Sequence, residues 1–234
     1  MDRPEPTLPR RLAAEGLGAF FLFATVIGSG IMAENLSRGN EAVALLANTA
    51  ATGAMLYVLI AMLGPISGAH MNPAVSLVAA LRRELGWRDA GLYALVQLGF
   101  GILGAWAAHL MYELPALQLS VKARTGLGQW TGEAVATFGL VIVILGTVRH
   151  RPQSVPASVA LYIVAAYWFT SSTSFANPAI TVARSLSDSF AGIAPADVAP
   201  FVATQLIGAL AAAAVACLLF APAASGADPG DRTC

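Results

Sequence analysis

The feature that most constrains this chain is an Asn-Pro-Ala tripeptide that occurs twice, each time at the start of a short apolar segment. Asparagine is a strong N-cap residue, and proline is favoured at the first helical position because its missing N–H would have no partner there. Each tripeptide therefore predicts the start of a helix, over residues 73–81 and over residues 178–186. The residues of the two tripeptides are Asn72, Pro73, Ala74, Asn177, Pro178 and Ala179.

The composition predicts a membrane protein. Hydrophobic residues make up 57% of the chain and charged residues 11%, whereas a soluble domain carries about a quarter charged residues. A membrane-spanning helix needs about 20 mostly apolar residues, so the two Asn-Pro-Ala segments, at about half that length, cannot span. Six stretches are expected to do so, at residues 12–33, 42–63, 90–111, 130–148, 155–170 and 198–221.

The two halves of the chain repeat each other. Glu15, Asn72 and Gln97 recur in the same order as Glu133, Asn177 and Gln205. Three spans per half is an odd number, so the second half must insert upside down relative to the first. The predicted fold is an all-α membrane protein with six transmembrane helices and two half-helices in an inverted repeat, the arrangement that places a site at the membrane midplane.

The expected layout is one channel domain at residues 12–222, flanked by tails at residues 1–11 and 223–234. Its half-repeats are expected at residues 12–112 and 130–222, with a connecting loop at residues 113–129. Arginines gather near one set of helix ends, at Arg10, Arg83 and Arg149 among others. Because basic residues mark cytoplasmic loops, both tails are expected in the cytoplasm.

Two half-helices that enter from opposite faces would meet N-terminus to N-terminus at the midplane. Each such end carries roughly half a positive elementary charge. The pair would repel cations, while the amides of Asn72 and Asn177 donate hydrogen bonds to a neutral solute, as in pores of the aquaporin type.

The segment from Ser67 to Val75, Ser-Gly-Ala-His-Met-Asn-Pro-Ala-Val, closely resembles the first signature of the aquaporin and glycerol-facilitator family. The resemblance covers essentially the whole chain. It implies a homotetramer in the lipid bilayer of a bacterial inner membrane, with a pore for small neutral solutes in each subunit and with neither cofactor nor metal. It also implies that backbone carbonyls of Gly68, Ala69, His70, Thr173 and Ser174 line the pore and that Glu15 and Glu133 brace its loops. His70 either lines the vestibule, which we favour, or packs.

The selectivity filter departs from the family's pattern. Carried over by spacing from the two asparagines, its four positions fall on Thr52, Ala165, Ser174 and Ile180. Water-selective members resemble Phe, His, a small residue and Arg there, and glycerol channels resemble Trp, Gly, Phe and Arg. Without an aromatic residue, histidine or arginine, the expected opening is wide and amphipathic. Such departures look like the branch of the family linked to metalloids and organoarsenicals.

An arginine does occur four residues beyond Ile180, at Arg184. Four residues are one helical turn on nearly the same face. Arg184 is therefore expected either to face the pore vestibule, or else to extend to the membrane interface or brace a loop.

The same sequence is compatible with other functions. A secondary transporter would also suit an inverted repeat, with Glu15 and Glu133 as candidate coupling residues, and a conventional water-selective aquaporin is a further alternative. An HExxH motif, a paired Asp cluster and a GxSxG motif are absent from the sequence, so an enzyme is not expected. Zero net charge gives no reason to expect nucleic acid.

Overall fold

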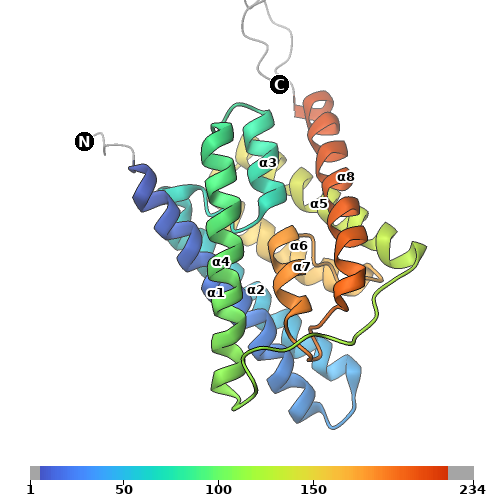
Figure 1. Cartoon of the computed structure of the whole chain (residues 1–234). Helices are drawn as coiled ribbons and strands as arrows, with labels where there is room; N and C mark the ends of the chain where they lie inside the picture. Colours follow the sequence, from blue (N-terminus) through green and yellow to red (C-terminus); the bar gives the residue numbers. More distant parts are fainter. Residues whose placement is uncertain (1–5, 221–234) are drawn as a thin grey trace, which may run out of the picture.

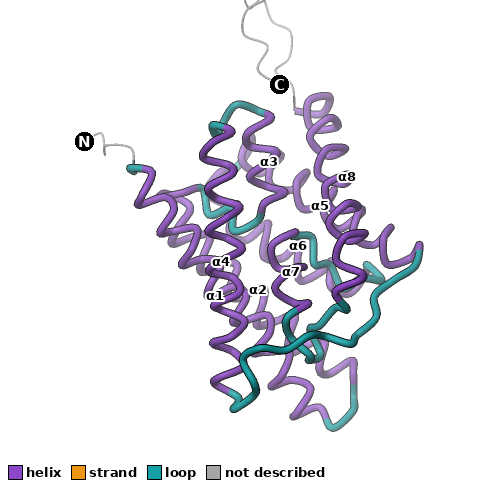
Figure 2. The backbone as a smooth tube through the Cα atoms, viewed as in Figure 1, coloured by secondary structure: helices purple, strands orange, loops and turns teal. Residues whose placement is uncertain are grey.

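The computed structural model describes residues 6–220, which form helices and loops with no strand (Figures 1 and 2). The elements in chain order are α1 Leu8–Ser37, α2 Glu41–Ser67, α3 Pro73–Leu81, α4 Trp87–Met111, α5 Leu127–His150, the 3-10 turn η1 Pro152–Ser154, α6 Val155–Phe169, α7 Pro178–Ser185 and α8 Pro195–Phe220. The predicted all-α fold, with six long helices and two half-helices, is confirmed.

Five helices, α1, α2, α4, α5 and α8, are long and apolar enough to cross a membrane. The sixth, α6, has 15 residues, and at 1.5 Å per residue it is about 22 Å long. The turn η1 immediately precedes it and lengthens this crossing.

Some boundaries differ from the predicted ones. Residues 8–11, expected in the tail, form the first turn of α1, where Arg11 pairs with Asp89 of α4 at 2.7 Å. The connecting loop covers residues 112–126, because α5 begins at Leu127. Residue 221, expected to end the last span, and the expected tail at residues 223–234 lie outside the described residues.

The two repeats pack in the same way. In the first, α1 lies against α2 and α4, and in the second, α5 lies against α6 and α8. Glycines bring the paired helices close: a Cβ on Gly104 would lie 2.2 Å from the Phe20 carbonyl oxygen, and one on Gly208 would lie 2.3 Å from that of Ala134. Small residues at such crossings are typical of membrane helices.

Each half-helix packs into the other repeat. α3 contacts α8 as well as α4, and α7 contacts α4 as well as α8. Figure 1 shows α3 near the side where the described chain begins and ends, which we call the terminal side. The loop at residues 112–126 runs along the opposite side, here the loop side, toward which α7 extends (Figure 2). Two half-helices therefore start in the middle of the molecule and point outward.

We expect Gly104→Ala to lower the unfolding free energy by about 1–3 kcal/mol, since its methyl group overpacks the crossing of α1 and α4. Gly99→Ala is the matched control on the same helix, because a Cβ there meets no atom within 4 Å. Alanine at position 99 should be neutral or slightly stabilising. Thermal unfolding in detergent measures both variants, and equal melting temperatures would contradict the close packing.

Candidate functional site: a pore between the repeats

A cavity of about 230 Å³ lies between the repeats. Its lining extends from Glu84 and Val148 near the terminal side to Tyr167 and Arg184 near the loop side. Both asparagines of the tripeptides line it at its middle. The cavity thus follows the direction in which a solute would cross the membrane.

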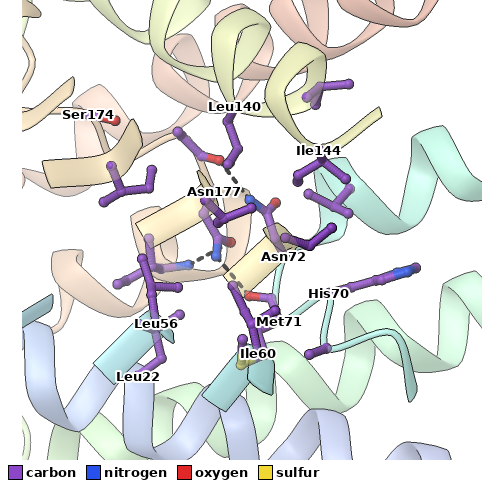
Figure 3. A pocket seen from close by; sticks show the side chains of 18 of the residues that line it. Leu22, Leu56, Ile60, His70, Met71, Asn72, Leu140, Ile144, Ser174 and Asn177 are labelled. Carbon is purple, nitrogen blue, oxygen red and sulfur yellow. Dashed lines mark hydrogen bonds between the residues drawn. The ribbon is translucent and has the colours of Figure 1, made fainter. Parts of the chain in front are cut away.

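Asn72 and Asn177 cap the half-helices and also join the repeats (Figure 3). The side-chain oxygen of Asn72 accepts from Ala74 N at 2.9 Å, and that of Asn177 accepts from Ala179 N at 3.0 Å. Each side-chain nitrogen donates at 2.8 Å to a carbonyl just before the other asparagine, Asn72 to Ala176 and Asn177 to Met71. An amide nitrogen has two N–H groups, so one on each asparagine is available to a solute.

A buried carboxylate stands behind each pore loop. The oxygens of Glu15 accept from His70 N at 2.9 Å and Met71 N at 2.6 Å. Those of Glu133 accept from Phe175 N at 2.8 Å and Ala176 N at 2.9 Å. Both glutamates are 0% exposed and neither lines the cavity. The sequence offered two roles for Glu15 and Glu133, as loop braces or as coupling residues of a transporter. In the structure, both carboxylates bind the backbone of the pore loops.

Gln97 and Gln205 complete the same network. Gln97 donates to Glu15 at 2.8 Å and to Ser76 at 3.2 Å, and Gln205 donates to Glu133 and, at 2.8 Å, to Thr181. The repeated Glu, Asn and Gln of the sequence therefore occupy equivalent places in the two halves.

The pore loops share an unusual backbone. Counting back from each asparagine, the fourth, third and first residues have positive φ in both loops: Gly68, Ala69 and Met71, and Thr173, Ser174 and Ala176. Left-handed backbone at a non-glycine residue costs of order 1–3 kcal/mol and persists only where the surroundings impose it. The hydrogen bonds to the two glutamates supply that restraint.

This backbone leaves carbonyl groups without protein partners. Within residues 6–220, the carbonyls of residues 68–70 and 173–175 accept no hydrogen bond. Gly68, Ala69, His70 and Ser174 line the cavity, whereas Thr173 does not. Buried carbonyls need a hydrogen-bond donor, and a solute can supply one to the carbonyls of the lining residues.

The remaining wall of the cavity is largely apolar. Leu140 and Ile144 of α5 lie on one side of the asparagine pair, and Leu56 and Ile60 of α2 lie on the other (Figure 3). A solute would therefore find hydrogen-bonding groups along one strip of the wall and hydrocarbon elsewhere.

His70 lies in the cavity lining, as favoured from the sequence. Its Nδ1 is 3.1 Å from the Ser76 hydroxyl, and its ring meets the edge of Tyr93 at a centroid distance of 5.5 Å. The residue therefore both lines the pore and packs.

Three of the four predicted filter residues, Thr52, Ser174 and Ile180, line the cavity, and Ala165 does not. Ala165 is exposed on the outside of α6. Helix α6 presents every fourth residue to the cavity, ending at Ile163 and Tyr167. Two residues are about 200° around a helix, so counting back from Asn177 across an irregular loop placed the prediction on the wrong face.

Aromatic rings occupy the pore, contrary to the expected opening without them. Tyr167 is buried, and its hydroxyl donates to the Thr52 hydroxyl at 3.4 Å. Phe175, the residue after Ser174, also lines the cavity. The four-residue spacing of Val155, Val159, Ile163 and Tyr167 was the sequence signal for this face of α6. Phe175 lies two residues before Asn177, as His70 does before Asn72, and this repeat spacing was the sequence signal for it.

Arg184 lines the cavity one turn beyond Ile180 and is 2% exposed, so it does not extend to the membrane interface. Its Nε donates to the Ala191 carbonyl, and its guanidinium carbon lies 3.3 Å from the centroid of the Phe175 ring. Arg184 thus faces the pore and also contacts a loop, which combines parts of the two sequence alternatives.

Similar proteins agree with this architecture. The family described as Major intrinsic protein matches residues 4–171. Aquaglyceroporin AqpS of Rhizobium meliloti (strain 1021) is 53% identical over 216 residues, 92% of each chain. Aquaporin NIP2-1 of Oryza sativa subsp. japonica is 28% identical over 80% of this chain and 64% of its own.

The X-ray structure of the aquaglyceroporin from Plasmodium falciparum superposes with a TM-score of 0.64 at 19% identity, covering 89% of this chain and 95% of the other. At that identity the likeness shows the fold. The family match and the identity to AqpS over most of both chains establish the relationship: the chain belongs to the major intrinsic protein family of membrane channels for small uncharged solutes.

Proposed function

We propose that this protein is a passive channel for uncharged solutes larger than water, including glycerol- and urea-sized molecules, arsenite and methylated arsenicals. The observation that carries the proposal is the part of the cavity lining formed by Thr52, Tyr167, Ser174 and Ile180, which we take as the constriction. It combines three hydroxyl groups with an aromatic ring and an aliphatic side chain, and the place of the family's filter arginine is taken by isoleucine.

The chemistry of this constriction suits solutes that carry both hydroxyl groups and carbon. The Ser174 hydroxyl is buried without a protein partner, so a solute hydroxyl can satisfy it. Ile180 and the ring of Tyr167 offer apolar surface to a carbon chain or methyl group. A buried hydroxyl left unpaired costs about 1–3 kcal/mol, which favours solutes that hydrogen bond there.

A secondary transporter is less well supported. Every carboxylate oxygen of Glu15 and Glu133 accepts a hydrogen bond from the protein, and neither residue reaches the cavity. Among the described lining residues, the one carboxylate is Glu84 at the terminal-side mouth. A coupling ion would therefore find no carboxylate at the middle of the pathway.

We further propose a homotetramer in the bacterial inner membrane, with the terminal side in the cytoplasm. The basic residues Arg82, Arg83 and Arg149 near that side support the orientation. Apolar side chains exposed on α2 and α6, such as Val58 and Leu161, are available to lipid or to neighbouring subunits.

Stopped-flow measurements on proteoliposomes test the proposal. Fluxes of glycerol, urea and arsenite should follow their own gradients and rise linearly with concentration, because no ion is coupled to them. An imposed proton or sodium gradient should leave them unchanged. Uphill accumulation driven by either ion would place the protein among the transporters.

Ile180→Arg should lower glycerol flux by about tenfold or more, equivalent to about 1.4 kcal/mol of barrier, with a smaller loss for water. The guanidinium narrows the constriction and offers donors that water satisfies more easily than a partly apolar solute. Ile180→Leu, which keeps volume and polarity, is the control and should retain the solute preference. Unchanged glycerol flux in Ile180→Arg would remove Ile180 from the filter.

Asn72→Asp and Asn177→Asp should each abolish most solute flux or introduce a cation leak. The aspartate loses the N–H that reaches Ala176 or Met71 and instead sets a carboxylate oxygen against that carbonyl. Asn40→Asp is the matched control, because Asn40 caps α2 through Val43 N at an exposed site and aspartate caps equally well. Normal flux and selectivity in both pore variants would refute the role assigned to the pair.

A further inference from the structure

Two arginines from distant parts of the chain gather around one phenylalanine at the loop-side end of the cavity. Arg184 of α7 lies 3.3 Å from the centroid of the Phe175 ring, and Arg124 of the connecting loop lies 4.9 Å from it, both measured from the guanidinium carbon. Arg124 is 9% exposed and, unlike Arg184, is not part of the cavity lining. It therefore stands behind the wall that Phe175 and Arg184 form.

Adjacent carbonyls hold both arginines in place. Arg184 Nε donates to the Ala191 carbonyl, and Arg124 Nε donates to the next one, Gly192, at 2.8 Å. Arg124 Nη1 also donates to the Ser172 carbonyl at 3.3 Å, just before the pore loop. Arg124 thus connects the segment that carries Ser174 and Phe175 to the segment that fixes Arg184.

The positive charges have no close counter-ions. Within residues 6–220, neither guanidinium forms a salt bridge, and Lys122 Nζ donates to the Phe190 carbonyl at 2.8 Å. The carboxylates in this region bind backbone instead. Glu133 accepts from the pore loop, Asp197 accepts from the backbone N of Arg124 at 2.7 Å, and Glu34 accepts from Phe190 N at 3.1 Å.

The titration of Lys122, unlike that of Arg124, reflects this accumulation of charge. Burial lowers the pKa of Arg124 to about 10, which leaves the group protonated at neutral pH. Burial, followed by the charges of Arg124 and Arg184, lowers the pKa of Lys122. Positive charge concentrated at the mouth of a low-dielectric pore repels cations in the entering solution.

We propose that Arg124 is a specificity-determining residue of this channel: with Arg184 it forms a cation barrier at the loop-side mouth, in place of a charge at position 180. The inference rests on the proposed channel function. Arg184 faces the solute directly. Arg124 is a positioning residue that fixes Phe175 and the loop around Arg184, and its own charge adds to the barrier from behind the wall.

Urea and guanidinium test the barrier, because they are planar and nearly equal in size but differ in charge. Proteoliposome fluxes of both are measured for the wild type and for Arg124→Gln, Arg184→Gln and Arg124→Lys. Each glutamine variant should raise the ratio of guanidinium to urea flux about tenfold, as expected when one charge is removed close to the path. Arg124→Lys loses the planar guanidinium that contacts Phe175, but it keeps the charge and should therefore hold the ratio within about threefold of the wild type.

The wild type provides a test that does not depend on folding of a variant. Raising salt from about 10 mM to about 500 mM shortens the screening length several-fold, so the guanidinium to urea ratio should rise while urea flux stays constant. The inference would be overturned if the guanidinium to urea ratio of the wild type did not change with salt. It would also be overturned if Arg124→Gln kept the wild-type ratio while urea still permeated. A fall of both fluxes together in Arg124→Gln and Arg124→Lys, with the ratio unchanged, would also overturn it by showing a structural role alone.

Failure of the underlying channel function has a different signature. In that case the wild type itself would not conduct urea above the level of empty liposomes.

Discussion

The reciprocal hydrogen bonds between Asn72 and the Ala176 carbonyl, and between Asn177 and the Met71 carbonyl, are the interaction on which the rest of the structure depends. They join two helix starts in the middle of a membrane, where water cannot satisfy backbone groups. Because each asparagine also caps its own half-helix, one side chain fixes the direction of the helix, the position of the opposite loop and the site of a free N–H. The pore, with its strip of unpaired carbonyls beside an apolar wall, follows from that arrangement.

The two buried glutamates make the strained loops possible. Each binds the two N–H groups just before its asparagine, and each is itself held by a glutamine from the last long helix of its repeat. The left-handed residues of the two loops therefore occur at equivalent positions. At the loop-side end the symmetry is broken, since Phe175, Arg184 and Arg124 have no counterpart of the same residue types in the first repeat. The residues to which we assign solute preference lie where the repeats differ.

The long helices could be predicted from the sequence by their length and apolarity, and the half-helices by their Asn-Pro starts. The predicted range of α3 agrees with the structure at both ends, and α7 ends one residue before its predicted end. Thr52, Ser174 and Ile180 were found because each lies a fixed number of residues from a cap asparagine. The prediction of Ala165 was wrong because seven loop residues, 170–176, lie between the end of α6 and Asn177. Their backbone conformations are mixed, so no helical period connects Ala165 to Asn177. Arg124 could not be found at all, since its partners Ser172 and Gly192 are distant in sequence and contribute backbone carbonyls that carry no residue-specific signal.

The packing of each half-helix into the opposite repeat has a consequence for biosynthesis. Ala74 and Val78 of α3 lie against Val141 of α5 and Ala209 and Ala212 of α8, which follow α3 in the chain. When the first repeat leaves the ribosome, α3 has no such surface, and the Met71 carbonyl lacks the amide of Asn177. A segment with unpaired backbone groups does not remain in lipid. The native packing of α3 and the partner of the Met71 carbonyl are therefore complete only after α7 and α8 of the second repeat have been made.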